Sequence, residues 1–133
     1  MKPRIEYIRK VLAAFEQSEE PYTNIYKLRD LGIDYKTNEF FFHLRIMEDE
    51  GLVAPYGSSH SLGYRVGARS EEVIWTHLPM RLTATGHDFA RTLENGDLLP
   101  KLSEVATSSG LQVAMAIGPQ LALAWAKDQL GLS

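Results

Sequence analysis

The hydrophobic pattern of the chain changes at Gly51. Before this glycine, apolar residues recur every three or four positions, which is the spacing of helices with one buried face. After it come short runs rich in β-branched and aromatic residues, separated by glycine and proline, which is typical of strands. Helical patterns return from Thr83 onward. This order predicts an α+β fold that is mostly helical.

Three helices are predicted before Gly51, the first of which begins at Ile5. The second is short, with Thr23 as its N-cap and Gly32 as the left-handed residue that ends it. Thr37 caps the third helix, which ends at the glycine where the pattern changes. The residues expected on the buried faces are Ile5, Ile8, Leu12 and Phe15 in the first helix, Ile25, Leu28 and Leu31 in the second, and Phe40, Leu44 and Met47 in the third.

A hairpin with a long tip is predicted after the third helix. Its first strand is LVAPY, the loop GSSHSLG forms the tip, and the segments YRV and EEVIWTHLPMRL follow. Thr83 then caps a fourth helix, and a fifth can form from Leu98 to Thr107. Residues 111–126 are apolar on nearly every side, and Pro119 predicts either two helical pieces or one kinked helix there.

The composition is that of one soluble globular domain, with 133 residues, 44% hydrophobic residues and no cysteine for a disulfide scaffold. The N-terminal segment has no apolar signal-peptide core, and no stretch reaches the roughly 18 uncharged apolar residues of a spanning helix. We therefore expect a cytoplasmic protein without a membrane segment. The net charge of −3 does not attract polyanions, so any nucleic-acid site must be local.

The positive charge that could form such a site lies in the first half of the chain. Residues 1–69 carry ten cations and ten anions, whereas residues 70–133 carry four cations and seven anions. The stretch 51–70 contains Arg65 and Arg69 and no carboxylate. The predicted hairpin is therefore a candidate for phosphate contacts.

Three helices followed by a hairpin is the order of a winged helix-turn-helix, in which the third helix lies in the DNA major groove and the hairpin flanks it. We assign residues 1–95 to this winged-helix domain. Residues 96–133 form a C-terminal helical extension that is expected to serve packing or dimerisation.

Four strings along the chain resemble a known protein family. They are IEYIRKVL, FHLRIMEDEGLV, RLTATGHDFARTL and the closing KDQLGL. Together they are similar to an uncharacterised bacterial and prophage winged-helix family, a domain-of-unknown-function group, over nearly the whole chain. Between Thr83 and Gly86 this family usually has an aromatic residue followed by an acid, whereas this chain has Ala84 and Thr85. The resemblance implies the fold and a phage-related setting, and it assigns no functional residues.

The outward face of the third helix carries the candidate DNA-reading residues. On a helical wheel, Asn38, Phe42 and Arg45 lie opposite the buried face. Asparagine can pair with adenine and arginine with guanine, and an aromatic ring can contact the thymine methyl group. Lys36 beside this helix and Arg65 in the hairpin could contact phosphates or the minor groove.

The histidines form no expected catalytic or metal site. His43 lies about 60° from the buried direction of its helix, so we expect it to be packed and hydrogen-bonded beside the core. The four histidines stand 17, 17 and 10 residues apart. The sequence also has no cysteine nucleophile, glycine-rich phosphate loop or histidine pair at metal-ligand spacing. We therefore expect no enzyme activity, no cofactor and no metal ion.

The apolar C-terminal segment needs a surface to pack against. Val113, Ile117, Leu121 and Trp125 could complete the domain's own core or pack against a second copy of the chain. We expect a homodimer, because this segment is more apolar than one small core requires, and a dimer would suit the paired half-sites that dimeric helix-turn-helix proteins bind.

A DNA-binding transcriptional regulator of phage-related origin is therefore the predicted function, with double-stranded DNA as its partner. The alternative is a winged-helix module that binds another protein through the aromatic face of the third helix and does not bind DNA. This alternative rests on charge, because Glu48, Asp49 and Glu50 follow the single outward cation Arg45.

Overall fold

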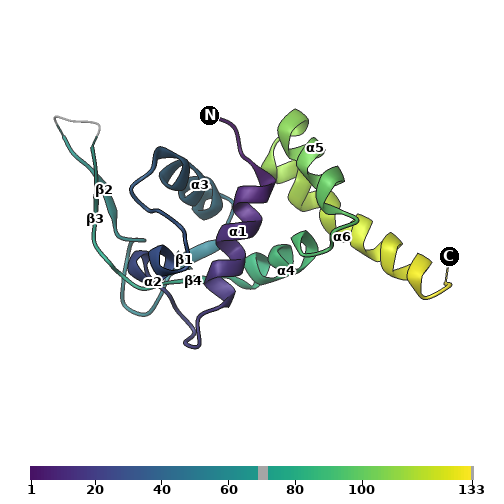
Figure 1. Ribbon diagram of the computed structural model, residues 1–133, viewed down its shortest axis with the longest axis horizontal. Coiled ribbons are helices and arrows are strands. Elements are labelled where there is room, and N and C mark those ends of the chain that lie inside the picture. Colours follow the sequence, from purple (N-terminus) through teal and green to yellow (C-terminus); the bar gives the residue numbers. More distant parts are fainter. Residues whose placement is uncertain (69–71, 133) are drawn as a thin grey trace.

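Helices and strands follow one another in the predicted order in the computed structural model, which describes residues 1–68 and 72–132. The elements are α1 (Ile5–Glu16), α2 (Ile25–Asp30), α3 (Asn38–Asp49), β1 (Val53–Pro55), β2 (Tyr64–Val66), β3 (Val73–Trp75), β4 (Met80–Leu82), α4 (Ala84–Leu93), α5 (Leu99–Ser109) and α6 (Leu111–Gln129). The hairpin lies at one end of the molecule and α6 at the other (Figure 1). The predicted mostly helical α+β class is confirmed, and the arrangement is consistent with a winged helix.

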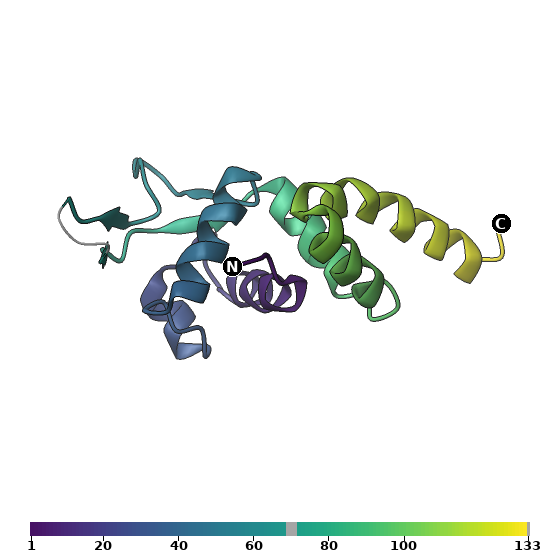
Figure 2. The same ribbon diagram turned by 90° about the horizontal axis from the view of Figure 1, so that it is seen from above.

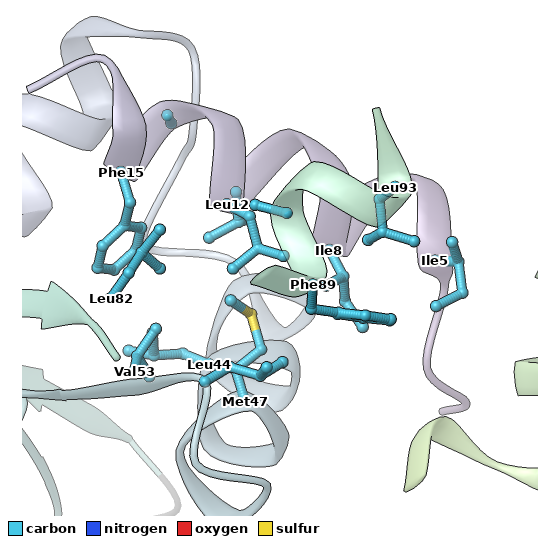
Figure 3. Packing of buried hydrophobic residues seen from close by; sticks show 14 of the residues in the cluster. Ile5, Ile8, Leu12, Phe15, Leu44, Met47, Val53, Leu82, Phe89 and Leu93 are labelled. Atoms are coloured by element: carbon cyan, nitrogen blue, oxygen red, sulfur yellow. The ribbon is translucent and has the colours of Figure 1, made fainter. Parts of the chain in front are cut away.

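α1 lies in the middle of the molecule and buries one face along its length (Figure 1). Its residues Ile5, Ile8, Leu12 and Phe15 are at most 6% exposed. They meet side chains of α3, α4 and the β1–β4 pair in a single hydrophobic core (Figure 3). The predicted buried face of the first helix is confirmed.

The N-cap of α2 is Asn24, so the prediction of Thr23 is wrong. The side-chain oxygen of Asn24 accepts hydrogen bonds from the backbone N–H groups of Tyr26 and Lys27, each at 3.0 Å. Thr23 is buried, and its backbone forms a β-bridge with Met80 through hydrogen bonds of 2.8 and 2.9 Å. This bridge to the end of the hairpin fixes Thr23 one residue before the helix cap.

α2 ends one residue earlier than its apolar spacing indicates. Leu31 is the C-cap and is 42% exposed, so its predicted place on the buried face is wrong. Gly32 has a φ of +91°, which confirms the predicted left-handed stop. The chain then turns back, and Ile33 is buried while its N–H donates to the carbonyl of Leu28 at 3.0 Å.

α3 begins and ends where the sequence predicts. The hydroxyl oxygen of Thr37 accepts a hydrogen bond from the N–H of Phe40 at 3.1 Å, and Gly51 follows the helix with a φ of +74°. Phe40, Leu44 and Met47 are at most 1% exposed, which confirms the predicted buried face. The opposite face of α3 is consequently free of the core.

The tip of the hairpin lies between β2 and β3, and its prediction at the loop GSSHSLG is wrong. β1 pairs with β4, and β2 pairs with β3, both antiparallel. Residues 57–63, which form that loop, connect β1 to β2 along one arm of the hairpin. Arg69, counted among the hairpin cations, lies outside the described residues.

Gly63 explains why the loop of residues 57–63 lies between β1 and β2 and does not form the tip of the hairpin. It has a φ of +100°, and a Cβ at this position would lie 2.1 Å from the carbonyl oxygen of Thr76. The N–H of Thr76 donates to the carbonyl of Gly63 at 2.7 Å, so the two arms meet again here. Only glycine permits this backbone approach, and the chain pairs as β2 and β3 beyond it.

The start of α4 is hydrogen-bonded to the residue just before β1. Thr83 caps the helix by accepting a hydrogen bond from the N–H of Gly86 at 3.0 Å, as predicted. The N–H of Thr83 also donates to the carbonyl of Leu52 at 3.0 Å. A Cβ on Gly86 would lie 2.1 Å from that same carbonyl oxygen, so the helix approaches β1 only because this residue is glycine.

α5 and the first half of α6 extend the core. Leu102, Ala106, Leu111 and Ala114 are at most 4% exposed and belong to the same buried cluster as α1. α6 is one helix through the exposed Pro119, so the alternative of two separate pieces is wrong. Its second half extends away from the rest of the molecule (Figure 2). None of the helices in the described part of the chain combines the length and hydropathy that crossing a membrane requires.

Candidate nucleic-acid interface

The outward side of α3 brings together four of the five predicted DNA-contact residues. Lys36, Asn38 and Arg45 are exposed, and Phe42 is half-buried. Asn38, Phe42 and Arg45 follow one another at four- and three-residue spacing, so they lie along one side of the helix. Lys36 precedes the cap, in a turn where its N–H donates to the carboxylate of Asp34 at 2.9 Å.

The hairpin packs against the neighbouring side of α3. The ring of Phe41 meets Tyr64 of β2 at 5.2 Å and Trp75 of β3 at 6.1 Å, both edge-on. The guanidinium of Arg45 lies 5.7 Å from the ring of Phe41 and 6.0 Å from that of Tyr64. Such cation–π contacts orient the arginine while they leave its hydrogen-bond donors available.

Arg65 is not brought together with the residues on α3. It follows Tyr64 in β2, and successive side chains of a strand point to opposite faces. Tyr64 faces α3, so Arg65 lies on the outer face of the hairpin, where its partner in register is Ile74. Arg65 is exposed and Ile74 is 43% exposed.

A groove of about 480 Å3, which we call the aromatic groove, separates the start of α3 from β3. Its aromatic lining residues are Tyr35, Phe41 and Trp75, and its charged and amide lining residues are Lys36, Asn38 and Glu72. Two of the predicted DNA-contact residues therefore share a concave site with three aromatic rings.

Two acidic side chains of α3 have polar partners within the protein. Glu39 forms an ion pair with Arg4, and Glu48 accepts a hydrogen bond from the hydroxyl of Tyr64 at 2.8 Å. Burial, together with this hydrogen bond to a carboxylate, raises the pKa of Tyr64. Asp49, at the end of α3, is exposed. The start of the helix, where Lys36 and Asn38 lie, is thus the less acidic end.

His43 is buried beside the core, as the sequence predicts. Its Nε2 accepts a hydrogen bond from the N–H of Arg4 at 2.9 Å, and its Nδ1 lies 2.7 Å from the carbonyl of Glu39. These partners require a neutral ring that carries its proton on Nδ1. Burial lowers the pKa of His43. The residue therefore ties the segment before α1 to α3 and does not face the candidate surface.

The contribution of the hairpin aromatic residues was missed by sequence reasoning. Tyr64 and Trp75 are directly opposite each other in the β2–β3 pair and cover Phe41, which the sequence places on the border of the outward face. The alternation of residues 64–66 and 73–75 contains a signal for this face. That signal is usable only once the register of the two strands is known.

Within residues 1–68 and 72–132, no three His, Cys, Asp or Glu side chains lie close enough together to hold a metal ion. The features that stand out in this part of the chain are the exposed side of α3 and the aromatic groove next to it. The fold is consistent with a winged-helix arrangement, and its third helix carries a polar and aromatic surface on the side away from the core.

The chain belongs to the family described as hypothetical protein (DUF2513), whose model matches residues 2–112. The match extends from the segment before α1 to the first residues of α6. No curated protein and no solved structure matches the chain.

Proposed function

We propose that this protein is a DNA-binding transcriptional regulator of phage-related origin, which acts on the DNA in the cytoplasm. In this proposal α3 enters the major groove and the hairpin lies alongside it. The observation that carries the proposal is the exposed set Lys36, Asn38 and Arg45, which lies opposite the fully buried face of an α3 flanked by a hairpin.

The roles of these residues follow from their chemistry. The amide of Asn38 and the guanidinium of Arg45 are the side-chain types that pair with the edges of adenine and guanine. Lys36 is placed in a turn just before α3, where an ammonium group contacts phosphate. Phe42, half-buried between Asn38 and Arg45, offers an apolar contact to a thymine methyl group. Arg65 on the outer face of the hairpin is assigned a phosphate or minor-groove contact.

A titration with labelled mixed genomic DNA at low and moderate salt tests the proposal. We expect binding at low salt that weakens as salt rises, because phosphate contacts release counterions. Arg45→Ala should weaken binding by about tenfold. Lys36→Ala should weaken it on all sequences and reduce the salt slope by about one. Absence of binding at low salt would reject the proposal.

Control variants separate this surface from the general charge of the protein. Arg91→Ala on α4 and Lys101→Ala on α5 remove exposed cations far from α3 in sequence, and both should bind like the unchanged protein. Arg65→Ala should have a smaller effect than Arg45→Ala, since Arg65 lies on the outer face of the hairpin. Equal losses in all four variants would mean that binding is unspecific.

The alternative, a module that binds a protein and not DNA, has less support on this surface. It depends on exposed phenylalanines on α3, and Phe41 packs edge-on against Tyr64 and Trp75. Phe41 and Phe42 are both half-buried, and Phe42 contacts the adjacent His43 ring edge-on at 5.2 Å. Two half-buried phenylalanines offer less area for a protein interface core than two exposed ones would.

We also propose that the second half of α6 joins two copies of the chain. Of the predicted dimerisation residues, Ile117 and Leu121 pack partly against the domain's own core, whereas Val113 and Trp125 are 41% and 37% exposed. Further along, Leu123 and Leu130 are 58% and 71% exposed. These two leucines are seven residues apart and so lie on one side of the helix.

Light scattering, at a protein concentration well above that of the DNA titration, tests this self-association. The unchanged chain should be a dimer, and Leu123→Glu combined with Leu130→Glu should be a monomer, because charge opposes apolar burial. Gln17→Glu combined with Ser58→Glu adds the same charge at exposed sites outside α6 and should remain a dimer. A monomeric unchanged chain would overturn the proposal.

A further inference from the structure

The walls of the aromatic groove are fixed by contacts within the protein. Trp75 meets the rings of Phe40 and Tyr64 at centroid distances of 5.5 and 6.0 Å. Tyr35 lies edge-on to Trp75 at 6.0 Å. On the other wall, the cap formed by Thr37 fixes the first turn of α3. A groove that is already formed loses little conformational freedom when a ligand enters.

The lining of the aromatic groove has the chemistry that recognises a nucleotide. Aromatic side chains contact the rings of unpaired bases in proteins that bind single strands. The amide of Asn38 can donate to and accept from a base edge, and the carboxylate of Glu72 can accept from an exocyclic amino group. The ammonium group of Lys36 can contact a phosphate. The volume of about 480 Å3 is within the usual range for small-molecule sites.

The groove contains one positive and one negative side chain, and this pair favours a nucleotide over a simple anion as the ligand. Lys36 attracts a phosphate, whereas Glu72 in the same groove repels one that approaches closely. A nucleotide satisfies both residues, because its phosphate and the amino group of its base are at different ends. Bases with an exocyclic amino group, such as cytosine and adenine, suit this arrangement better than thymine.

We propose that the aromatic groove takes one unpaired base of a single-stranded or locally opened DNA segment. This inference rests on the proposed function and names the form of DNA that this part of the surface prefers. In a duplex, every base is stacked and paired, so a base enters the groove only after it leaves the stack, which requires energy. A single strand presents the base without that requirement.

Trp75 itself reports on the groove. The chain has two tryptophans, so Trp125→Phe leaves Trp75 as the single tryptophan, whose emission is excited selectively over that of tyrosine. This variant is titrated at low salt with a labelled oligo(dC) single strand and with an oligo(dC)·oligo(dG) duplex, while anisotropy follows total binding. We expect the single strand to quench Trp75 as it binds and to bind about tenfold more tightly than the duplex. Oligo(dT) should bind more weakly than oligo(dC).

Substitutions in the groove test the same inference by anisotropy alone. Trp75→Leu should weaken single-strand binding by about tenfold. Since Trp75 also packs against Phe40 and Phe41 of α3, Asn38→Ala provides a second test at an exposed residue, and it should reduce the preference for oligo(dC) over oligo(dT). Lys101→Ala, outside the groove, is the matched control for Lys36→Ala and should leave single-strand binding unchanged.

The outcomes separate this inference from the proposed function. Duplex binding without quenching of Trp75, and with no preference for the single strand, overturns the inference while the DNA-binding proposal stands. Failure of both forms of DNA to bind at low salt overturns both.

Discussion

His43 shows how one buried side chain links stability to pH. Its ring accepts the N–H of Arg4 through Nε2, and a proton on Nε2 would break this bond. Burial is the main reason that the pKa of His43 is lowered from its usual value near 6.5. The unfolded chain therefore binds this proton at a higher pH than the folded chain does.

We expect stability to fall as the solution becomes more acidic than pH 6.5. The contribution of His43 is complete above the pKa of the unfolded state and is lost as pH falls toward the lower pKa of the folded state. Urea unfolding at pH 7.5 and pH 5.5 measures this difference. In His43→Asn the fall between the two values should be smaller. An equal fall in both proteins would show that His43 is not responsible.

Gly86 is a second position where one residue decides local structure. In Gly86→Ala the new Cβ overlaps the carbonyl oxygen of Leu52, so the start of α4 must move from β1. Crowding of this kind typically costs about 1–3 kcal/mol of unfolding free energy, although alanine favours the helix by about 1 kcal/mol. We expect a net loss of about 1 kcal/mol, measured by urea unfolding.

Gly96→Ala is the matched control for Gly86→Ala. Nothing lies within 4 Å of a Cβ built on Gly96, and the residue has no positive φ. Its unfolding free energy should therefore equal that of the unchanged protein or exceed it slightly. A loss as large as that of Gly86→Ala would contradict the steric explanation.

At the scale of the element, α3 depends on Thr37 for its first turn. This hydroxyl accepts the N–H of Phe40, and the same turn carries Asn38 and follows Lys36. Thr37→Ala should lower the unfolding free energy by about 1 kcal/mol. It should also weaken DNA binding, because the start of α3 becomes less ordered.

Thr107→Ala on α5 is the control for the capping prediction. Its hydroxyl donates to the carbonyl of Ser103 within an exposed helix, where no N-terminal N–H depends on it. Loss of this side chain should change the unfolding free energy by less than about 0.5 kcal/mol. If both threonine variants lose the same stability, the cap is not the cause.

At the scale of the whole molecule, α6 divides into two parts with different roles. Leu111, Ala114 and Gly118 are buried, and a Cβ on Gly118 would lie 3.3 Å from Thr92 of α4. Beyond Ala122, the side chains are mostly exposed, and the indole N–H of Trp125 donates a hydrogen bond to the carboxylate of Asp97 at 2.9 Å. The core therefore needs only the first part of the helix.

A chain ending after Ala122 should fold like the complete chain at low protein concentration. Its melting temperature should differ by no more than about 4 °C, the shift expected for about 1 kcal/mol in a domain of this size. A chain ending after Ser109 loses Leu111 and Ala114 and should melt well below both. Equal melting temperatures for the two truncated chains would show that α6 is not part of the core.

Elements with local signals could be predicted from the order of residues alone. The spacing of Phe40, Leu44 and Met47 defined the buried face of α3, and Thr37 and Thr83 marked two helix starts. These signals are readable because a helix repeats within four residues and a cap acts within three. The mixed class and the order of helices and hairpin follow from the same information.

Where the hairpin turns and which residues it covers depend on contacts between distant parts of the chain. Thr23 has the residue type and position of a helix cap in the sequence, yet its backbone forms a β-bridge with Met80, far along the chain. The loop before Gly63 resembles a tip, yet pairing with Thr76 places the tip further on. Strand register joins residues distant in sequence, so no local pattern specifies it. The aromatic groove, built from α3 and β3, exists for the same reason only in the folded chain.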